Sequence, residues 1–226
     1  MSPTEVKTIK PLMEAMPNNS MDVRAKQRLS YQRSLVTFSG LGGGFAPRHL
    51  SRYASMVNSN ELLLKAASED NLDSLKLALA EGAEINVAND FGFSALICAA
   101  TYGHIEIVRF LLANGANLNH RSQHELSALQ QAVSWQHLET VKLLLDSGAD
   151  VNESGNLGTT PLMVAAARGD MAITQLLLER GAIPNQRDAE NLNAWDWAMI
   201  KANPEIGELL VQAGAKTEFP EKTADA

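Results

Sequence analysis

The chain has 226 residues, 45% apolar and 20% charged, enough to bury the core of one ordinary domain or two small ones. Because Cys98 is the single cysteine, the sequence excludes a disulfide framework and a Cys-rich zinc site. It contains neither an apolar run long enough to predict a membrane span nor the apolar N-terminal core of an export signal. Residues 1–57 carry eight Lys and Arg against three acids (+5), whereas residues 58–226 carry eleven against twenty-three (−12), so the larger part would repel nucleic acid.

Residues 1–45 are predicted to be a disordered basic segment. Prolines and the run Asn18-Asn19-Ser20 interrupt residues 1–21, and residues 22–38 show only a weak helical pattern. The glycines of residues 40–44 indicate a linker, because no strand precedes them and no Gly-Lys-Ser/Thr follows. No acidic residue occurs between Val23 and Asn60, which leaves a targeting sequence as an alternative.

Residues 46–57 are predicted to form a capping helix. Leu50, Tyr53, Ala54 and Val57 recur at helical spacing after Pro47. We expect this helix to shield the apolar end of the domain that follows, because the end units of a stacked protein need a polar outer surface.

From residue 58 the sequence repeats itself with a period of 33 residues. Four kinds of position stay in phase, which chance does not produce. They are the Gly-Ala glycines Gly82, Gly115, Gly148, Gly181 and Gly214, the alanines Ala66, Ala99, Ala132, Ala165 and Ala198, the asparagines Asn86, Asn119, Asn152 and Asn185, and the large apolar residues Leu63, Leu96, Leu129, Leu162 and Trp195. We therefore predict one repeat domain over residues 58–217, with units of about 58–88, 89–121, 122–154, 155–187 and 188–217.

Each period predicts two short helices and a loop. In the second unit Ser94 is suited to cap a first helix, Gly103 allows a turn, and Gly115 supplies the left-handed residue that ends a second helix. The apolar stripes of these helices are Leu96, Ala99 and Ala100, then Ile105, Val108, Leu111 and Leu112. The polar stretch 86–93 predicts a projecting hairpin between units.

The repeat resembles the ankyrin repeat. The runs that carry the resemblance are Gly-Thr-Thr-Pro-Leu-Met-Val-Ala-Ala at 158–166, Gly-His-Ile-Glu-Ile-Val at 103–108 and Leu-Leu-Ala-Asn-Gly-Ala-Asn-Leu-Asn at 111–119. The resemblance covers residues 58–217 and implies an all-α solenoid of five stacked helix-turn-helix units with short β-hairpin loops and a concave face. The first and last units depart most from the pattern and are interpreted as terminal caps, followed by an acidic C-terminal tail at 218–226.

The resemblance also implies which positions face the concave surface: the hairpin tips and the ends of the first helices. These positions hold Asp90, Phe91, Phe93, Tyr102, His124, Leu126, Trp135, Leu157 and Arg168. Four of the chain's twelve aromatic residues are among them, and aromatic residues and arginine dominate binding hot spots. We predict a protein-binding site centred on units two and three. The alternative is that these rings pack between adjacent hairpins.

No residue pattern predicts catalysis, a cofactor or a metal. The resemblance makes His104 and His137 structural linkers between helices. His120 and His124 are four residues apart, but in a predicted loop this spacing does not align them for a metal. Cys98 lies among apolar helical residues and is expected to be a small buried hydrophobe.

The expected function is a non-catalytic, cytoplasmic, monomeric scaffold or adaptor. It would bind an unidentified protein partner with a basic surface through the concave face of repeats 2–4, and neither nucleic acid nor a membrane is an expected partner. The alternative is a regulatory or host-interaction protein of the effector type. In that case the basic N-terminal segment would be a targeting element or an autoinhibitory arm attracted to the acidic repeats.

Overall fold

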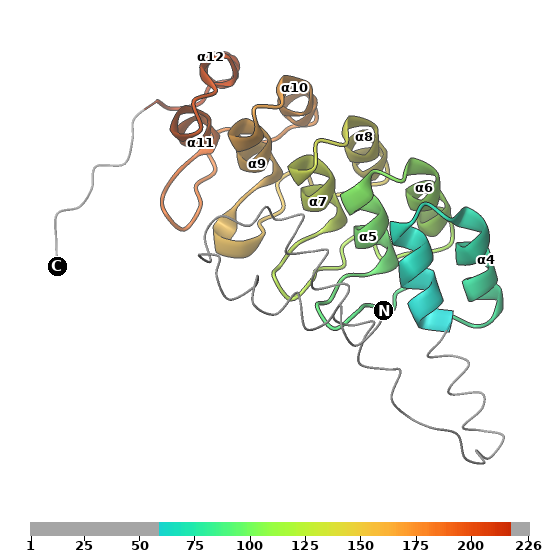
Figure 1. Ribbon diagram of the computed structural model, residues 1–226. Helices are drawn as coiled ribbons and strands as arrows, with labels where there is room; N and C mark the ends of the chain where they lie inside the picture. The colour runs from blue at the N-terminus through green and yellow to red at the C-terminus, as the bar shows by residue number, and fades with distance from the viewer. Residues whose placement is uncertain (1–58, 218–226) are drawn as a thin grey trace, which may run out of the picture. The chain divides into compact units, whose positions relative to one another are not determined.

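The computed structural model describes residues 59–217, which form helices stacked in two rows (Figure 1). The predictions for residues 1–45, 46–57 and 218–226 lie outside this range. The inner row comprises a helix over 59–68, α5 (Ala95–Tyr102), α7 (Ala128–Ser134), α9 (Pro161–Arg168) and α11 (Ala194–Ile200). The outer row comprises α4 (Leu72–Ala80), α6 (Ile105–Ala113), α8 (Leu138–Asp146), α10 (Met171–Glu179) and α12 (Pro204–Gln212). Each inner helix and the outer helix after it form one repeat, numbered 1 to 5 along the chain.

The inner helices begin at side-chain caps that recur with the period of the sequence. Each capping side chain accepts a hydrogen bond from the backbone N–H three residues further on, which satisfies one of the amides that a helix start leaves unpaired. The caps are Ser94, Ser127, Thr160 and Asn193. The predictions that Ser94 caps a helix, that Gly103 allows the turn after it and that Gly115 is left-handed are confirmed; Gly103 is left-handed as well.

The small residues of the repeat allow the inner helices to approach closely. Ala99, Ala132, Ala165 and Ala198 are fully buried, and Ala66 is 2% exposed. The large apolar positions Leu63, Leu96, Leu129 and Leu162 are buried beside them. Adjacent inner helices contact one another more extensively than adjacent outer helices do. The core therefore follows the inner row from repeat to repeat.

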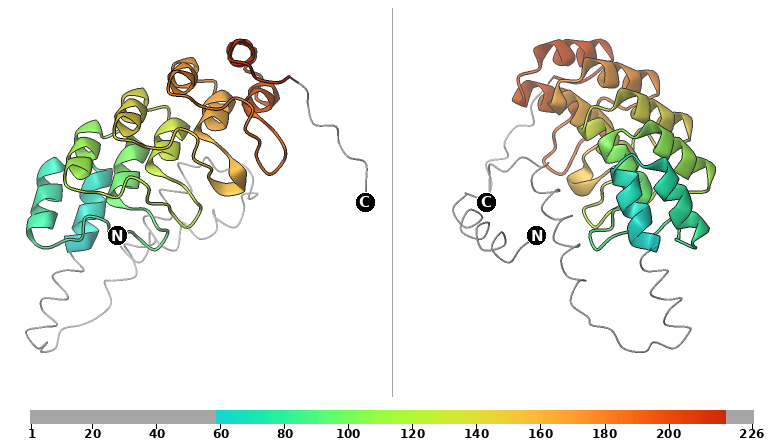
Figure 2. Two further views of the ribbon diagram at one scale, coloured as in Figure 1. Left: turned by 180° about the vertical axis from the view of Figure 1, so that it is seen from behind. Right: turned by 45° about the vertical axis from the view of Figure 1, so that its right-hand side comes forward.

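Hairpin-shaped loops project from one side of the stack (Figures 1 and 2). Each tip is closed by a backbone hydrogen bond of 3.0–3.1 Å that spans four residues: Asn89 to Phe93, Ser122 to Leu126, Gly155 to Thr159 and Asp188 to Leu192. Within residues 59–217 the only β-pairing is the isolated bridge between Ala88 and Ser94. The third tip, at Gly155 to Thr159, contains a 3-10 turn, η1 (Asn156–Gly158). The predicted all-α repeat solenoid is thus confirmed, with loops that have hairpin turns but almost no strand.

Candidate functional site

The candidate face comprises the nine residues predicted to bind a partner, and the structure places them on two kinds of element. Asp90, Phe91, Phe93, His124, Leu126 and Leu157 lie on the hairpin loops. Tyr102 is the last residue of α5, Trp135 is the C-cap of α7, and Arg168 is the last residue of α9. These three residues occupy the same position in consecutive repeats. They therefore form a row across repeats 2, 3 and 4.

The candidate face is not uniformly exposed. Tyr102 is 43% exposed and Leu157 is 62% exposed, and Asp90, His124 and Arg168 are also exposed. Phe91, Phe93, Leu126 and Trp135 are half-buried. These four side chains pack against their neighbours on one part of their surface and remain accessible to a partner on the rest.

A hydrogen bond holds Trp135 in place, and ring stacking holds Tyr102. The buried amide oxygen of Gln131 accepts from Trp135 Nε1 at 3.2 Å and from Thr101 Oγ1 at 3.3 Å. Thr101 is itself buried, so it packs beneath the surface and is not part of the candidate face. Tyr102 stacks on His104, with 5.8 Å between ring centroids. The aromatic row is therefore preorganised.

Two histidines link successive repeats beneath this row. His104 Nε2 donates to the carbonyl oxygen of Ser68, and His137 Nε2 donates to that of Thr101, both at 3.1 Å. A Cβ added at Gly103 would lie 2.6 Å from His137 Nδ1, so the turn accepts only glycine while the histidine keeps this position. These contacts agree with the expected role of both histidines as structural linkers.

Neighbouring hairpins are joined by hydrogen bonds. The backbone N–H of Gln123 donates to Phe91 O at 3.0 Å, and its side chain donates to Asp90 O at 2.7 Å. A Cβ at Gly92 would approach Gln123 N to 2.8 Å, so this close contact requires glycine. Further along, Ala189 N donates to Leu157 O at 2.8 Å. The loops of the candidate face are thus fixed relative to one another.

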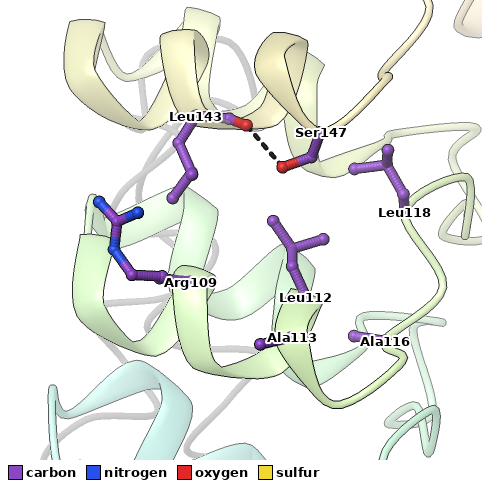
Figure 3. A pocket seen from close by; sticks show the side chains of 7 residues that line it. All are labelled: Arg109, Leu112, Ala113, Ala116, Leu118, Leu143 and Ser147. Carbon is purple, nitrogen blue, oxygen red and sulfur yellow. Dashed lines mark hydrogen bonds between the residues drawn. The ribbon is translucent and has the colours of Figure 1, made fainter.

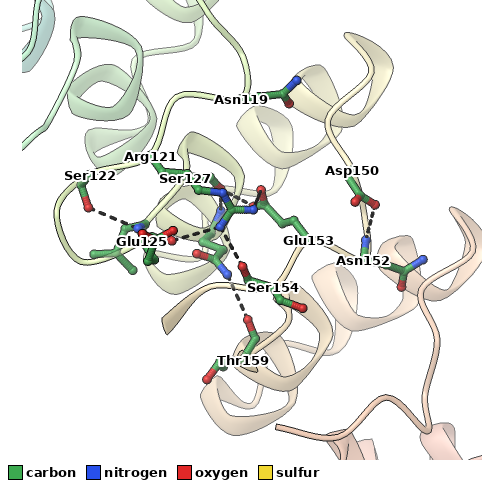
Figure 4. A network of polar contacts seen from close by, with 12 residues as sticks. Asn119, Arg121, Ser122, Glu125, Ser127, Asp150, Asn152, Glu153, Ser154 and Thr159 are labelled. Carbon is green, nitrogen blue, oxygen red and sulfur yellow. Dashed lines mark hydrogen bonds and ion pairs between the residues drawn. The ribbon is translucent and has the colours of Figure 1, made fainter. Parts of the chain in front are cut away.

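A buried carboxylate joins the hairpins closed at Ser122–Leu126 and Gly155–Thr159 (Figure 4). Glu153 is 8% exposed, accepts a hydrogen bond from Ser127 Oγ and lies 3.4 Å from Arg121 Nη2. Arg121 also donates to the carbonyl oxygen of Ser154 at 2.8 Å. Burial raises the pKa of Glu153 above its ordinary value of 4.5, although the Ser127 hydrogen bond and the Arg121 charge act in the opposite direction. Because its partners are structural, we interpret this cluster as a clamp between hairpins.

Sequence reasoning did not identify the Glu153 cluster, although the repeat register contains a signal for it. The equivalent positions hold Val87, His120 and Gln186. His120 Nε2 donates to Gly92 O at 2.8 Å, and Gln186 donates to Ser154 Oγ at 3.0 Å. Three polar residues at one repeat position indicate a shared hydrogen-bonding role. In this arrangement the His120 side chain is held by a backbone carbonyl group.

A second feature that the sequence did not reveal is a hollow of about 390 Å³ between α6 and α8 (Figure 3). Ala113 and Ser147 line it, together with Leu112, Leu118 and Leu143. At the next interface the equivalent positions hold Asp146 and Arg180, which form an ion pair at 2.8 Å. The hollow exists because two small residues replace this pair. Ser147 Oγ donates to Leu143 O, so its hydroxyl hydrogen is already used.

Metal-binding clusters, the lone cysteine and the length of the helices bear on other functions that the described residues could have. No cluster of three or more His, Cys, Asp or Glu suited to a metal occurs within 59–217. Cys98 is 4% exposed, and burial raises the pKa of its thiol to about 12, so it is an unreactive core residue. None of the helices in the described part of the chain has the length and apolar character needed to cross a membrane.

Comparison with known families accounts for the repeats. The sequence model for ankyrin repeats, in three copies, matches residues 63–155 and 153–220. No curated protein matches the chain. Ankyrin repeats generally mediate protein–protein interaction and are typically non-catalytic. The match covers most of the chain, and the structure has the stacked helix pairs and hairpins of such repeats, so the chain belongs to the ankyrin-repeat family.

Proposed function

We propose that the protein is a non-catalytic scaffold or adaptor that binds a protein partner through the candidate face of repeats 2–4. The row formed by Tyr102, Trp135 and Arg168 carries this proposal. Two aromatic side chains and an arginine, at one repeat position in successive repeats, supply the residue types on which binding hot spots depend. The hydrogen bonds beneath the row and between the hairpins support it, because a surface ordered in advance loses little conformational entropy on binding.

The partner is expected to present apolar anchors surrounded by basic groups. Residues 59–217 contain ten Lys and Arg against twenty Asp and Glu, a net charge of −10. Exposed acids on the hairpins include Asp90, Glu125 and Glu190. Arg168 is the exception on the face, and we expect it to meet a carboxylate of the partner. Association should slow as salt is added, and an association rate that does not depend on salt would contradict the electrostatic part of the proposal.

Paired alanine substitutions test the binding face. Protein carrying Tyr102→Ala and Trp135→Ala is compared with unaltered protein in affinity capture from the native cell extract, followed by mass spectrometry. Leu77→Ala is the matched control, because Leu77 is a large exposed residue on the outer helix α4, 52% exposed. We expect one protein to be retained by the unaltered chain and the control and lost by the double variant.

The result depends on the double variant remaining folded. Thermal unfolding of all three proteins supplies this check, because the half-buried Trp135 contributes to packing as well as to the face. Equal capture by all three proteins, together with a lowered melting temperature of the double variant, would show that the aromatic row serves packing and not recognition.

The charge asymmetry of the chain favours a second candidate function. Residues 1–57 carry +5 and residues 58–226 carry −12, so the basic segment is a candidate autoinhibitory arm for the acidic repeats. Removing residues 1–45 distinguishes the two candidates. A simple scaffold keeps its affinity for the captured partner, whereas an autoinhibited protein binds that partner more tightly after the deletion.

A further inference from the structure

The free end of repeat 5 is apolar where the end of a repeat stack is expected to be polar. Met199 is 38% exposed, whereas the equivalent residues Ala67, Ala100, Val133 and Ala166 of repeats 1–4 are fully buried. Trp195 is half-buried, whereas its equivalents Leu63, Leu96, Leu129 and Leu162 are 0–1% exposed. Ile200 and Val211 add exposures of 50% and 45%. In repeats 1–4 a following repeat covers these positions, and within residues 59–217 none follows repeat 5.

This apolar end contains a groove of about 510 Å³. Trp195 and Met199 of α11, Gly207 and Val211 of α12, and Thr217 line it. Gly207 replaces the fully buried Leu75, Val108, Val141 and Thr174 of the other repeats. A Cβ at residue 207 would lie 3.0 Å from Met199 Sδ and 3.4 Å from Trp195 Nε1. The absence of a side chain at Gly207 therefore lets Met199 and Trp195 lie against α12.

The residues that follow α12 make the same hydrogen bonds as the equivalent residues that follow α10, one repeat earlier. Lys216 N donates to Asn185 Oδ1 at 2.7 Å, and Asn185 Nδ2 donates to Gly214 O at 2.8 Å. One repeat earlier, Ile183 N and Gly181 O are bound by Asn152 in the same way, at 2.8 and 3.1 Å. Thr217, which lines the groove, is the next residue. The path of the repeat is thus preserved as far as the groove.

Two residues further along, this register reaches Phe219. One, two and three periods earlier, the equivalent positions hold Gln186, Glu153 and His120, whose side chains form hydrogen bonds with Ser154 Oγ, Ser127 Oγ and Gly92 O respectively. Two extended residues span about 7 Å, and Thr217 itself lines the groove. Among residues 212–226, only Phe219 has a large apolar side chain.

We propose that Phe219 packs into this groove against Trp195 and Met199 and so closes the free end of the stack. A phenylalanine side chain buries about 150–250 Å² of surface, which suits a shallow apolar groove. The glutamates at positions 218 and 221 flank it and supply the polar outer surface that an end unit needs. The groove lies at the end of the stack and not on the candidate face, so this proposal is independent of the proposed function.

Thermal unfolding of the full chain gives the first test. Phe219→Ala should lower the melting temperature by about 4 °C, because removing a partly buried ring from a domain of this size has that effect. Phe219→Leu should restore most of the loss, and Glu221→Ala is the control in the same segment. An unchanged melting temperature for Phe219→Ala would overturn the proposal.

A double-substitution comparison then locates the contact. Phe219→Ala combined with Met199→Ala should lower the melting temperature by less than the sum of the single changes, because both remove the same contact. Phe219→Ala combined with Leu77→Ala should be additive, since Leu77 lies in repeat 1. Additive effects in both pairs would show that Phe219 does not contact this groove.

Sedimentation of the full chain tests a second copy as the occupant. The proposal expects a monomer whose sedimentation is unchanged by Met199→Lys. A dimer that Met199→Lys dissociates would place another copy on the end face and would overturn the assignment to Phe219.

Discussion

The inner and outer rows of helices achieve the same stacking in different ways. Between inner helices, alanines such as Ala99 and Ala132 are fully buried, and hydrogen bonds join the adjoining hairpins. Between outer helices, contact is looser: the hollow beside Ala113 separates α6 from α8, whereas the Asp146–Arg180 ion pair closes the next interface. The inner row therefore fixes the geometry on which the candidate face depends, and the outer row tolerates variation.

The comparison is tested most strongly by the same substitution in both rows of repeat 2. Ala99→Leu should destabilise the protein by about 3 kcal/mol, because the added atoms have no space between inner helices. Ala113→Leu should change the free energy of unfolding by less than about 0.5 kcal/mol, because it extends into the hollow. Urea unfolding of both variants measures the difference. Similar losses from both would show that the outer row is packed as tightly as the inner row.

The hydrogen bonds on the hairpin side are tested by comparing two helix caps. Ser94→Ala removes a cap alone and should cost about 1 kcal/mol. Ser127→Ala removes a cap and also the hydroxyl that donates to buried Glu153, so it should cost about 2 kcal/mol. Chemical denaturation at pH 7 measures both losses. Equal losses would mean that the Glu153 cluster adds nothing to the connection between repeats 3 and 4.

The turns that join the two rows differ in strain. Ala202 has φ +58° at the position where Gly103 and Gly169 occur in repeats 2 and 4. Ala202→Gly should stabilise the protein by about 0.5 kcal/mol, because relief of the left-handed strain exceeds the added entropy of the unfolded chain. Gly103→Ala is the reverse control and should destabilise, since its Cβ meets the His137 ring. The thermal unfolding midpoints decide the signs, and a destabilising Ala202→Gly would contradict the interpretation.

The smallest expected effect is the pH dependence contributed by Glu153. Because burial raises its pKa in the folded state, ionised Glu153 lowers stability at pH values above that folded pKa, and the penalty is relieved as pH falls toward 4.5. Glu153→Gln carries no such penalty. Its stability relative to the unaltered protein should therefore decrease as pH falls from 7 to 4.5 in a series of urea titrations. A relative stability that stays constant or increases would show that the pKa is not raised.

The sequence predicted the positions where the repeat itself demands one residue type. Ser94 caps a helix and Gly115 adopts a left-handed conformation, as their repeat positions indicate. The same reasoning did not predict that Gln136 and Ala202 adopt left-handed conformations, because only a glycine at such a position indicates a positive φ in the sequence. It also did not find the Glu153 cluster, because the equivalents of Glu153 and Arg121 in the preceding repeat are His120 and Ala88, so the pair does not recur there.

By itself the sequence determined the period, the two helices of each repeat and the family, because hydrophobic spacing, caps and glycines act locally and recur every 33 residues. Only the tertiary structure decided how far each ring of the candidate face is buried, where the outer helices leave a hollow and which end of the stack exposes apolar surface. Those properties depend on side chains from neighbouring repeats meeting in space. Exposure of Tyr102 or Met199 therefore depends on what packs beside each residue, which the repeat pattern alone does not specify.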